Sequence, residues 1–274
     1  MRDEWFRAIE LPLNWKQFHE LPRNAAYKYE YFDDHAWLSP RPKSYHAVLP
    51  LTPRAAETRV DVQGPIAVRP LEDADWEDLP LVFAVAFARV PPFSSMEDEE
   101  RRQAGRACLE HTRDDGDGPL IRQACFVAMT EDHHLVGAIL VTLAPRGDLT
   151  EFGSLHWRKK PPKNAVERRL GRAHVTWVFV APMFAGHGVG SAMLSSAVNG
   201  LVGLGYTELV TTFISGNDSS MLWHWRNGFE LAEYGGSLRG MRRRIQGERD
   251  AKPRRSASKK LSSRASRQSR HKTK

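Results

Sequence analysis

Residues 174–190, HVTWVFVAPMFAGHGVG, decide the fold, because a strand-forming run leads there into a turn with three glycines. His174 to Val180 is β-branched and aromatic, which is typical of a strand. A helix should follow the turn, since apolar side chains recur every four residues at Val189, Met193, Ala197 and Leu201. The sequence therefore predicts a strand, a glycine turn and a helix in direct succession.

The glycine turn has the composition of an anion-binding site. Backbone N–H groups at a helix start lack intrahelical partners, and the helix dipole adds positive charge there. Gly186, Gly188 and Gly190 would let the backbone approach a phosphate without Cβ clashes. A glycine-rich turn is also an ordinary connection between a strand and a helix. Both interpretations stay open on this feature alone.

Two well-known phosphate motifs do not match the turn. A Walker A loop requires Lys followed by Ser or Thr after its last glycine, and no Lys follows Gly190. A dinucleotide-binding fingerprint requires GxGxxG and an acidic residue at the end of the next strand. Here the turn is GxGxG, and Glu208 begins the next predicted strand.

The turn belongs to a longer pattern of motifs. The pattern comprises Val180-x-Pro182-x-x-x-Gly186-x-Gly188-x-Gly190, then Asn217, then Arg226-Asn227-Gly228-Phe229-Glu230. It resembles the GNAT superfamily of N-acetyltransferases over about residues 66–245. The resemblance implies an α/β (α+β) fold, with a mixed, mostly antiparallel central sheet flanked by helices. It also implies acetyl-CoA as the cosubstrate.

In that superfamily the turn binds the pyrophosphate of acetyl-CoA, and amides of the preceding strand stabilise the thioester carbonyl. Ala185 stands where the family has Arg or Gln, but the main contacts are backbone amides, which Ala supplies equally well. The cofactor-binding residues implied by the resemblance are Phe179, Val180, Ala185, Gly186, His187, Gly188, Val189, Gly190, Ser191 and Asn217.

Direct acetyl transfer to an alkylamine requires a base, because such an amine has a pKa near 10 and is protonated at neutral pH. His174, six residues before Val180, resembles the position of a catalytic glutamate or histidine in two branches of the superfamily. A histidine titrates near pH 6.5, which suits a base. The alternative is a hydrogen-bonded histidine at the start of the strand.

A second candidate group is His224, seven residues after Asn217. Many family members have at this position a tyrosine that protonates the leaving thiolate, so the resemblance implies that His224 donates instead. The alternative is a helix histidine packed beside Trp223 and Trp225 and bonded to a carbonyl. No metal site is predicted.

The leading hypothesis is an N-acetyltransferase that moves an acetyl group to a primary amine of a small molecule or a protein. Ala185 and the missing tyrosine at position 224 motivate an alternative. In that alternative, the chain is a weak or inactive acyl-CoA-binding module that acts through partners.

The length of 274 residues favours one catalytic domain with extensions. We expect a β-rich N-terminal unit at 1–62, with a hairpin of residues 27–32 and 36–38. A GNAT-like domain should span 63–246, and a disordered basic tail should span 247–274. The last 24 residues hold ten Lys or Arg and no acid, whereas the rest of the chain has 30 basic and 33 acidic residues.

The tail could neutralise phosphates without reading sequence, so non-specific nucleic acid is one predicted partner. A solvated tail without a specific partner is the alternative. Two cysteines exclude a disulfide-rich scaffold, and the longest apolar run is far shorter than a membrane span. We therefore expect a cytoplasmic protein with no membrane partner.

Overall fold

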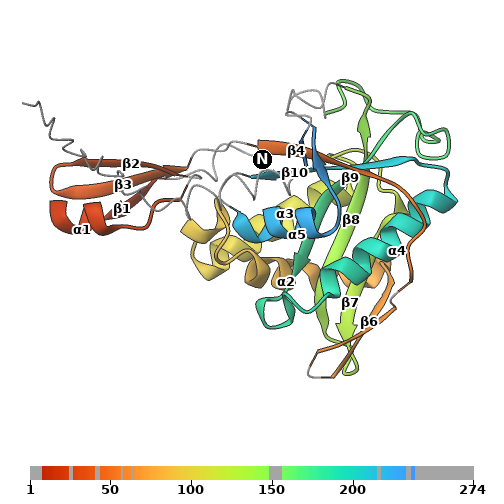
Figure 1. The fold of residues 1–274 in the computed structure, drawn as a ribbon, viewed down its shortest axis with the longest axis horizontal. Coiled ribbons are helices and arrows are strands. Elements are labelled where there is room, and N and C mark those ends of the chain that lie inside the picture. Colours follow the sequence, from red (N-terminus) through yellow and green to blue (C-terminus); the bar gives the residue numbers. More distant parts are fainter. Residues whose placement is uncertain are drawn as a thin grey trace, which may run out of the picture. The chain divides into compact units, whose positions relative to one another are not determined.

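The strand that leads into the glycine turn is the central strand of a nine-stranded sheet in the computed structural model of the protein (Figure 1). This strand, β9, spans Gly171–Val180, and the helix after the turn, α4, spans Val189–Gly203. Between them Pro182–Phe184 forms one 3-10 turn. The predicted succession of strand, turn and helix is confirmed.

The structure describes residues 8–24, 27–40, 44–56, 58–62, 64–147, 156–214 and 217–232 and the backbone of 236–237. All of them belong to one compact unit, Met1–Leu238. The predicted tail at 247–274 lies outside the described residues, and so does the predicted end of the catalytic domain at residue 246.

The sheet is mixed and mostly antiparallel, which confirms the predicted fold class. β9 pairs in parallel with β10 (Glu208–Ile214), and each other pairing among the described strands is antiparallel. The strand order is β12-β11-β4-β10-β9-β8-β7-β6-β5. The other strands are β4 (Ser44–Pro50), β5 (Arg59–Asp61), β6 (Pro65–Pro70), β7 (Phe126–Thr130), β8 (Leu135–Pro145), β11 (Glu230–Leu231) and β12 (Gly236–Ser237).

The central pair, β9 and β10, separates part of the way along its length. The parallel pairing ends where Thr211 lies opposite Val175. At this level the register of β9 against β8 shifts between Leu140 and Val141, which leaves Thr176 as an extra residue. Such a bulge bends its strand. Beyond the bulge β9 stays paired with β8, and within the described chain its other edge is open.

Helices cover both faces of the sheet. They are α2 (Leu79–Ala86), α3 (Asp98–Arg113), α4 and α5 (Asp218–Arg226). Neighbouring residues of a strand point to opposite faces. On β8, Ala138 shares a buried cluster with Phe83 of α2 and Leu109 of α3, whereas a Cβ on Gly137 would lie 3.2 Å from Met193 of α4. Thus α2 and α3 cover one face, and α4 covers the other.

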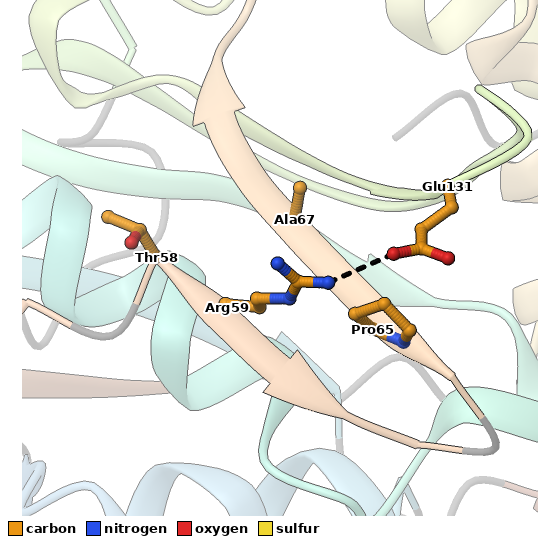
Figure 2. A pocket seen from close by; sticks show the side chains of 5 residues that line it. All are labelled: Thr58, Arg59, Pro65, Ala67 and Glu131. Carbon is orange, nitrogen blue, oxygen red and sulfur yellow. Dashed lines mark hydrogen bonds and ion pairs between the residues drawn. The ribbon is translucent and has the colours of Figure 1, made fainter.

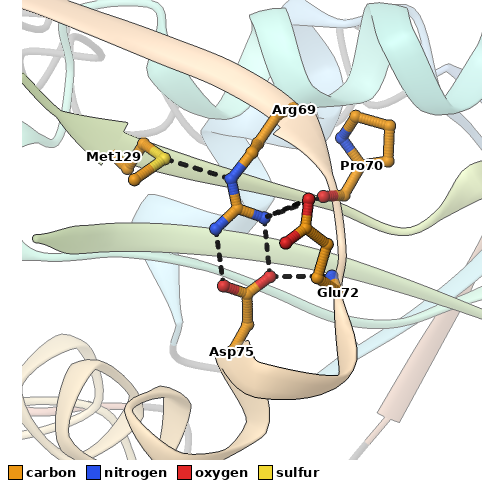
Figure 3. A network of polar contacts seen from close by, with 5 residues as sticks. All are labelled: Arg69, Pro70, Glu72, Asp75 and Met129. Atoms are coloured by element: carbon orange, nitrogen blue, oxygen red, sulfur yellow. Dashed lines mark hydrogen bonds and ion pairs between the residues drawn. The ribbon is translucent and has the colours of Figure 1, made fainter. Parts of the chain in front are cut away.

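An ion pair at the end of β6 fixes the turn that leads into α2 (Figure 3). Arg69 donates two hydrogen bonds, of 2.7 and 2.8 Å, to the carboxylate of Asp75. Asp75 also accepts the backbone N–H of Glu72 at 2.8 Å. Burial acts to raise the pKa of Asp75, but these hydrogen bonds hold it below its ordinary value. The carboxylate therefore stays charged and fastens the turn at Asp73–Glu77 to the sheet.

The N-terminal segment contributes to two sheets. A small sheet with the order β1-β3-β2 contains the predicted hairpin, which is thereby confirmed. Its strands are β1 (Ile9–Leu11), β2 (Tyr27–Phe32) and β3 (His35–Pro40), and helix α1 spans Trp15–Glu20. By contrast, β4 and β5 belong to the nine-stranded sheet. The segment 1–62 therefore supplies two strands to the sheet of the domain that we expected to begin at residue 63.

Among the described residues, no helix has the length and apolar character needed to cross a membrane. The same residues contain no group of three or more His, Cys, Asp or Glu side chains placed to hold a metal ion.

Candidate active site

The glycine turn presents its backbone outward. Gly186 and Gly188 have φ angles of +82° and +91°, in the left-handed region that side chains disfavour. Gly188 is the N-cap of α4, and no side chain bonds to the first-turn amides from that position. Residues 185–188, which include the predicted Ala185 and His187, are exposed. Amides at a helix start favour negative charge, so this turn fits an anionic group such as a pyrophosphate.

A buried donor lies beside the turn. Val189, Gly190 and Ser191 form the first turn of α4, and a Cβ on Gly190 would lie 2.9 Å from Nε1 of Trp223 on α5. No acceptor for that indole N–H is found in the described chain, although the atom is buried. Because buried N–H groups normally have a partner, this one fits a bound polar group. Together the open amides and the indole fit acetyl-CoA.

Asn217 is the N-cap of α5. Its Oδ1 accepts the N–H of Ser220 at 3.1 Å, and its carbonyl accepts the N–H of Met221 at 3.0 Å. The side-chain oxygen therefore caps the helix. The amide Nδ2 is the side-chain donor left for the predicted contact with the cosubstrate.

Alternate residues of β9 turn their backbone groups toward the open edge. The N–H of Ala181 donates to the carbonyl of Val136 on β8 at 2.7 Å. Phe179, two residues earlier, therefore also directs its N–H and C=O groups toward β8. Val180 and Val178 direct theirs the other way. Of the two strand residues predicted to stabilise a thioester carbonyl, Val180 has the suitable orientation, and Val178 shares it.

His174 lies on β9 just before the bulge, on the face covered by α2 and α3. It is opposite Thr142 of β8, whose hydroxyl donates to the carbonyl of Asp117 at 3.1 Å. Asp117 closely follows the last residue of α3. The pairing of β9 with β10 ends one residue after His174, at Val175. The predicted base therefore borders the place where the two strands begin to separate.

Hydroxyl groups hold both nitrogens of the His174 ring. Nδ1 lies 3.1 Å from Oγ1 of Thr176, and Nε2 lies 3.1 Å from Oγ1 of Thr212. Removal from water, with His46 and His156 nearby, lowers the pKa of His174 to about 3. The value of 6.5 assumed from the sequence is therefore too high. The ring is neutral at pH 7, which is the state that a proton acceptor requires.

His224 is buried in α5 with both nitrogens bonded. Nδ1 lies 2.7 Å from the carbonyl of Ser220, which can only accept, so Nδ1 carries the proton. Nε2 accepts from the hydroxyl of Thr211 at 3.0 Å. Burial lowers the pKa of His224 to about 4, although the bond to Ser220 acts to raise it. These contacts match the packed histidine described as the alternative. Donation to a thiolate stays a prediction and would require the bond to Ser220 to open.

The structure does not bring the two predicted histidines together. Thr211 and Thr212 are consecutive on β10 and so point to opposite faces of the sheet. Thr211 bonds to His224, whereas Thr212 bonds to His174. The sheet therefore separates the two rings, and His174 alone lies on the face of α2 and α3.

A pocket of about 260 Å³ lies on the outermost strands β5 and β6 (Figure 2). It is lined by Thr58, Arg59, Pro65, Ala67 and Glu131. Arg59 donates to Glu131 at 2.9 Å, and both side chains are about two-thirds exposed. None of the predicted site residues lines this pocket, so it lies outside the candidate active site.

Sequence reasoning missed most of the groups around His174. His46 of β4 lies opposite Thr212 of β10, and its Nδ1 is 2.9 Å from the hydroxyl of Thr212. No spacing rule connects His46 with His174, because strand pairing joins segments that are remote in sequence. The available signal was the pair of consecutive threonines in the strand that begins at Glu208, because alternation along a strand places one of the two on each face of the sheet.

Known proteins similar to this chain include several acetyltransferases. Crystal structures similar to the chain include a GCN5-related N-acetyltransferase from Sphaerobacter thermophilus, with 14% identity and a TM-score of 0.45. That match covers 84% of this chain, which spans 58% of the Sphaerobacter chain. A GNAT family acetyltransferase from Brucella melitensis, in complex with acetyl-CoA, has 16% identity and a TM-score of 0.40. That match covers 63% of this chain and 90% of the Brucella chain.

The PaiA N-acetyltransferase from Thermoplasma acidophilum, in complex with coenzyme A, has 16% identity and a TM-score of 0.41. That match covers 63% of this chain and 94% of the Thermoplasma chain. The comparison with curated proteins gives no match. The family model described as the acetyltransferase (GNAT) family matches residues 88–229, which include the glycine turn. Because that match spans more than half of the chain, the protein belongs to the GNAT family of acetyltransferases.

Proposed function

We propose that this GNAT acetyltransferase moves the acetyl group of acetyl-CoA directly to a primary amine. One observation carries the proposal: an uncapped glycine turn at the start of α4 adjoins the edge of β9 that β10 leaves open. Acetyl-CoA requires a site for its phosphate groups next to a site for its thioester, and these two features would supply them. Family membership supports acetyl-CoA as the donor.

Acetyl-CoA, when bound, supplies the acetyl group as a thioester. The amides from Ala185 to Ser191 would hold its pyrophosphate, and the dipole of α4 would favour that charge. The N–H of Val180 would donate to the carbonyl oxygen, on which negative charge develops during attack. The indole N–H of Trp223 is a further donor at the turn.

The acceptor must lose protons in this reaction. An alkylammonium loses one proton to become nucleophilic and a second as its nitrogen bonds to the acetyl carbon. The C–S bond breaks, one proton ends on the thiol of coenzyme A, and one leaves to solvent. His174 is neutral and faces the side of α2 and α3, so we assign it the removal of a proton from the amine. The acceptor would then enter from that side.

The test is a panel of amines that includes polyamines, amino acids and lysine peptides, with free thiol measured as coenzyme A is released. We expect thiol release that depends on one class of amine, and an acetylated product of the matching mass. Calorimetric binding of acetyl-CoA without thiol release on any amine would favour the alternative, an acyl-CoA-binding module. Absence of both binding and release would overturn the proposed function.

A further inference from the structure

A single chain of hydrogen bonds runs through His174 and crosses four strands of the sheet. In order, its members are His46, Thr212, His174, Thr176, Thr142 and the backbone carbonyl of Asp117. The successive distances between the bonded atoms are 2.9, 3.1, 3.1, 2.8 and 3.1 Å. Each hydroxyl in this series of hydrogen bonds has one proton to donate, so the donor and acceptor of every bond can be worked out from one end.

The carbonyl of Asp117 sets the direction of the first half. A carbonyl oxygen only accepts, so the hydroxyl of Thr142 donates to it. The hydroxyl of Thr176 must then donate to Thr142, because the proton of Thr142 is already used. With its own proton used in turn, Thr176 accepts from Nδ1–H of His174. Neutral His174 therefore carries its proton on Nδ1.

The same reasoning assigns the donors and acceptors of the remaining hydrogen bonds, from His174 to His46. A neutral imidazole has one N–H, so Nε2 of His174 accepts, and the hydroxyl of Thr212 donates to it. Thr212 then accepts from Nδ1–H of His46. A hydroxyl oxygen has two lone pairs, and His46 uses one of them. The described residues supply no contact for the other.

Thr212 borders the opening between β9 and β10, where the proposed function places the acceptor amine. It is the first residue of β10 beyond the last pair with β9, Thr211 opposite Val175. Its side chain is half-buried, whereas His46 behind it is 3% exposed. Thr176 also borders the opening but accepts from His174, so it cannot pass a proton to that ring.

We propose that the hydroxyl of Thr212 relays the amine proton to Nε2 of His174, and that His46 orients this hydroxyl. The inference rests on the proposed acetyltransferase function. The amine N–H bond breaks as its proton bonds to the oxygen of Thr212, while the hydroxyl's own proton passes to Nε2. Thr212 is restored, His174 becomes an imidazolium, and that proton later leaves to solvent. His46 is a positioning residue, which the N-terminal strand β4 supplies to the site.

Kinetics on the full chain test the relay with the best amine of the panel. Thr212→Val keeps the side chain's shape and should lower kcat by about 10² or more, near the effect of one general base. Thr212→Ser restores a hydroxyl and should recover most of the rate. Thr212→Val should add little to the loss in a His174→Gln background, since both act in one step. Acetyl-CoA affinity should not change in any of them.

The matched control is Thr130→Val, at the end of β7, where the hydroxyl accepts the N–H of His134 and lies outside the chain of bonds. It should keep the wild-type kcat. His46→Phe should lower kcat less than Thr212→Val, because it removes the orienting N–H but leaves the relaying hydroxyl in place. A Thr212→Val variant with the wild-type kcat would overturn the relay.

A spectroscopic readout is independent of turnover. With ¹⁵N-labelled histidine in the full chain, NMR at pH 7 should show His174 protonated on Nδ1 and bare on Nε2. An active enzyme with the opposite tautomer would overturn the relay and leave the proposed function standing. A chain that transfers acetyl groups to no amine would instead overturn the proposed function, and the catalytic role of the relay with it.

Discussion

The ring of His174 is the group that we propose for proton transfer. Burial keeps it neutral, because the pKa is lowered to about 3, and hydroxyls on both sides fix its orientation. A neutral, oriented ring can accept a proton at once. Its weak basicity is tolerable because the amine nitrogen becomes far more acidic as it bonds to the acetyl carbon.

Replacing this ring should remove the base and leave the cosubstrate site intact. His174→Gln should lower kcat/KM by about 10² to 10⁴, the usual effect of one positioned base. Because the pKa is about 3, the wild-type kcat/KM should show no acidic limb from His174 between pH 6 and 7. Steady-state rates from pH 5 to 9 check both statements. A wild-type rate in the variant would show that water accepts the proton.

Burial of His224 should make stability depend on pH. Its pKa is about 4 in the folded protein, against an ordinary 6.5, so between these values the unfolded chain binds a proton that the folded chain does not. This contribution is complete above pH 6.5 and is lost as the pH falls toward 4. His174 acts in the same direction.

Urea unfolding of the wild type and of His224→Gln from pH 4 to 7 measures the effect. The free energy of unfolding of the wild type should fall more steeply with decreasing pH, by up to about 1.4 kcal/mol per pH unit for one proton. Parallel slopes for the two proteins would contradict the assigned pKa.

Single residues differ in how far the sequence could predict them. His174 and Val180 could be placed because both belong to one strand next to the glycine turn. The sequence predicted Gly190 as a glycine that lets a phosphate approach the backbone. The structure adds a second reason for glycine there, because Trp223 occupies the space that a Cβ would need. His46 could not be placed, because its neighbourhood arises from pairing between remote strands.

At the scale of elements, local patterns predicted what local geometry determines. The glycine turn, its helix and the β2–β3 hairpin follow from short-range periodicity and turn chemistry. The insertion of β4 between β10 and β11 does not, because its seven residues lie among prolines and resemble a connecting segment. Strand propensity depends on the neighbours that a segment finds in the folded sheet.

Removal of β4 should therefore destabilise the fold much more than removal of the small N-terminal sheet. Ala47 and Leu49 on β4 are buried, and β4 is the partner of both β10 and β11. A chain lacking residues 1–50 should lose its cooperative thermal transition, whereas a chain lacking residues 1–40 should keep it and still respond to acetyl-CoA. Scanning calorimetry of both checks this. A wild-type transition after the longer deletion would make the N-terminal strand dispensable.

At the scale of the whole molecule, charge is unevenly distributed. Residues 251–274 hold ten basic and no acidic residues, so we propose that this tail accounts for any affinity for polyanions. A chain that ends at Gly247 should keep its melting temperature and acetyl-CoA binding and lose most heparin or RNA affinity. For the full chain, that affinity should fall steeply with salt. Equal affinity in both chains would locate polyanion binding in the catalytic domain.

Binding of acetyl-CoA at the glycine turn is tested most directly by the thermal shift that acetyl-CoA causes. At 100 times the dissociation constant, binding adds about 2.7 kcal/mol to stability, which for a chain of this size raises Tm by roughly 5 to 10 °C.

Gly188→Asp places a carboxylate at the uncapped start of α4 and should abolish the shift, while Gly205→Asp is the matched control. Gly205 also has a positive φ, of +80°, but lies just beyond the other end of the same helix. We predict the shift in the wild type and in Gly205→Asp and none in Gly188→Asp. An unmoved wild-type Tm, or an equal shift in Gly188→Asp, would contradict the account.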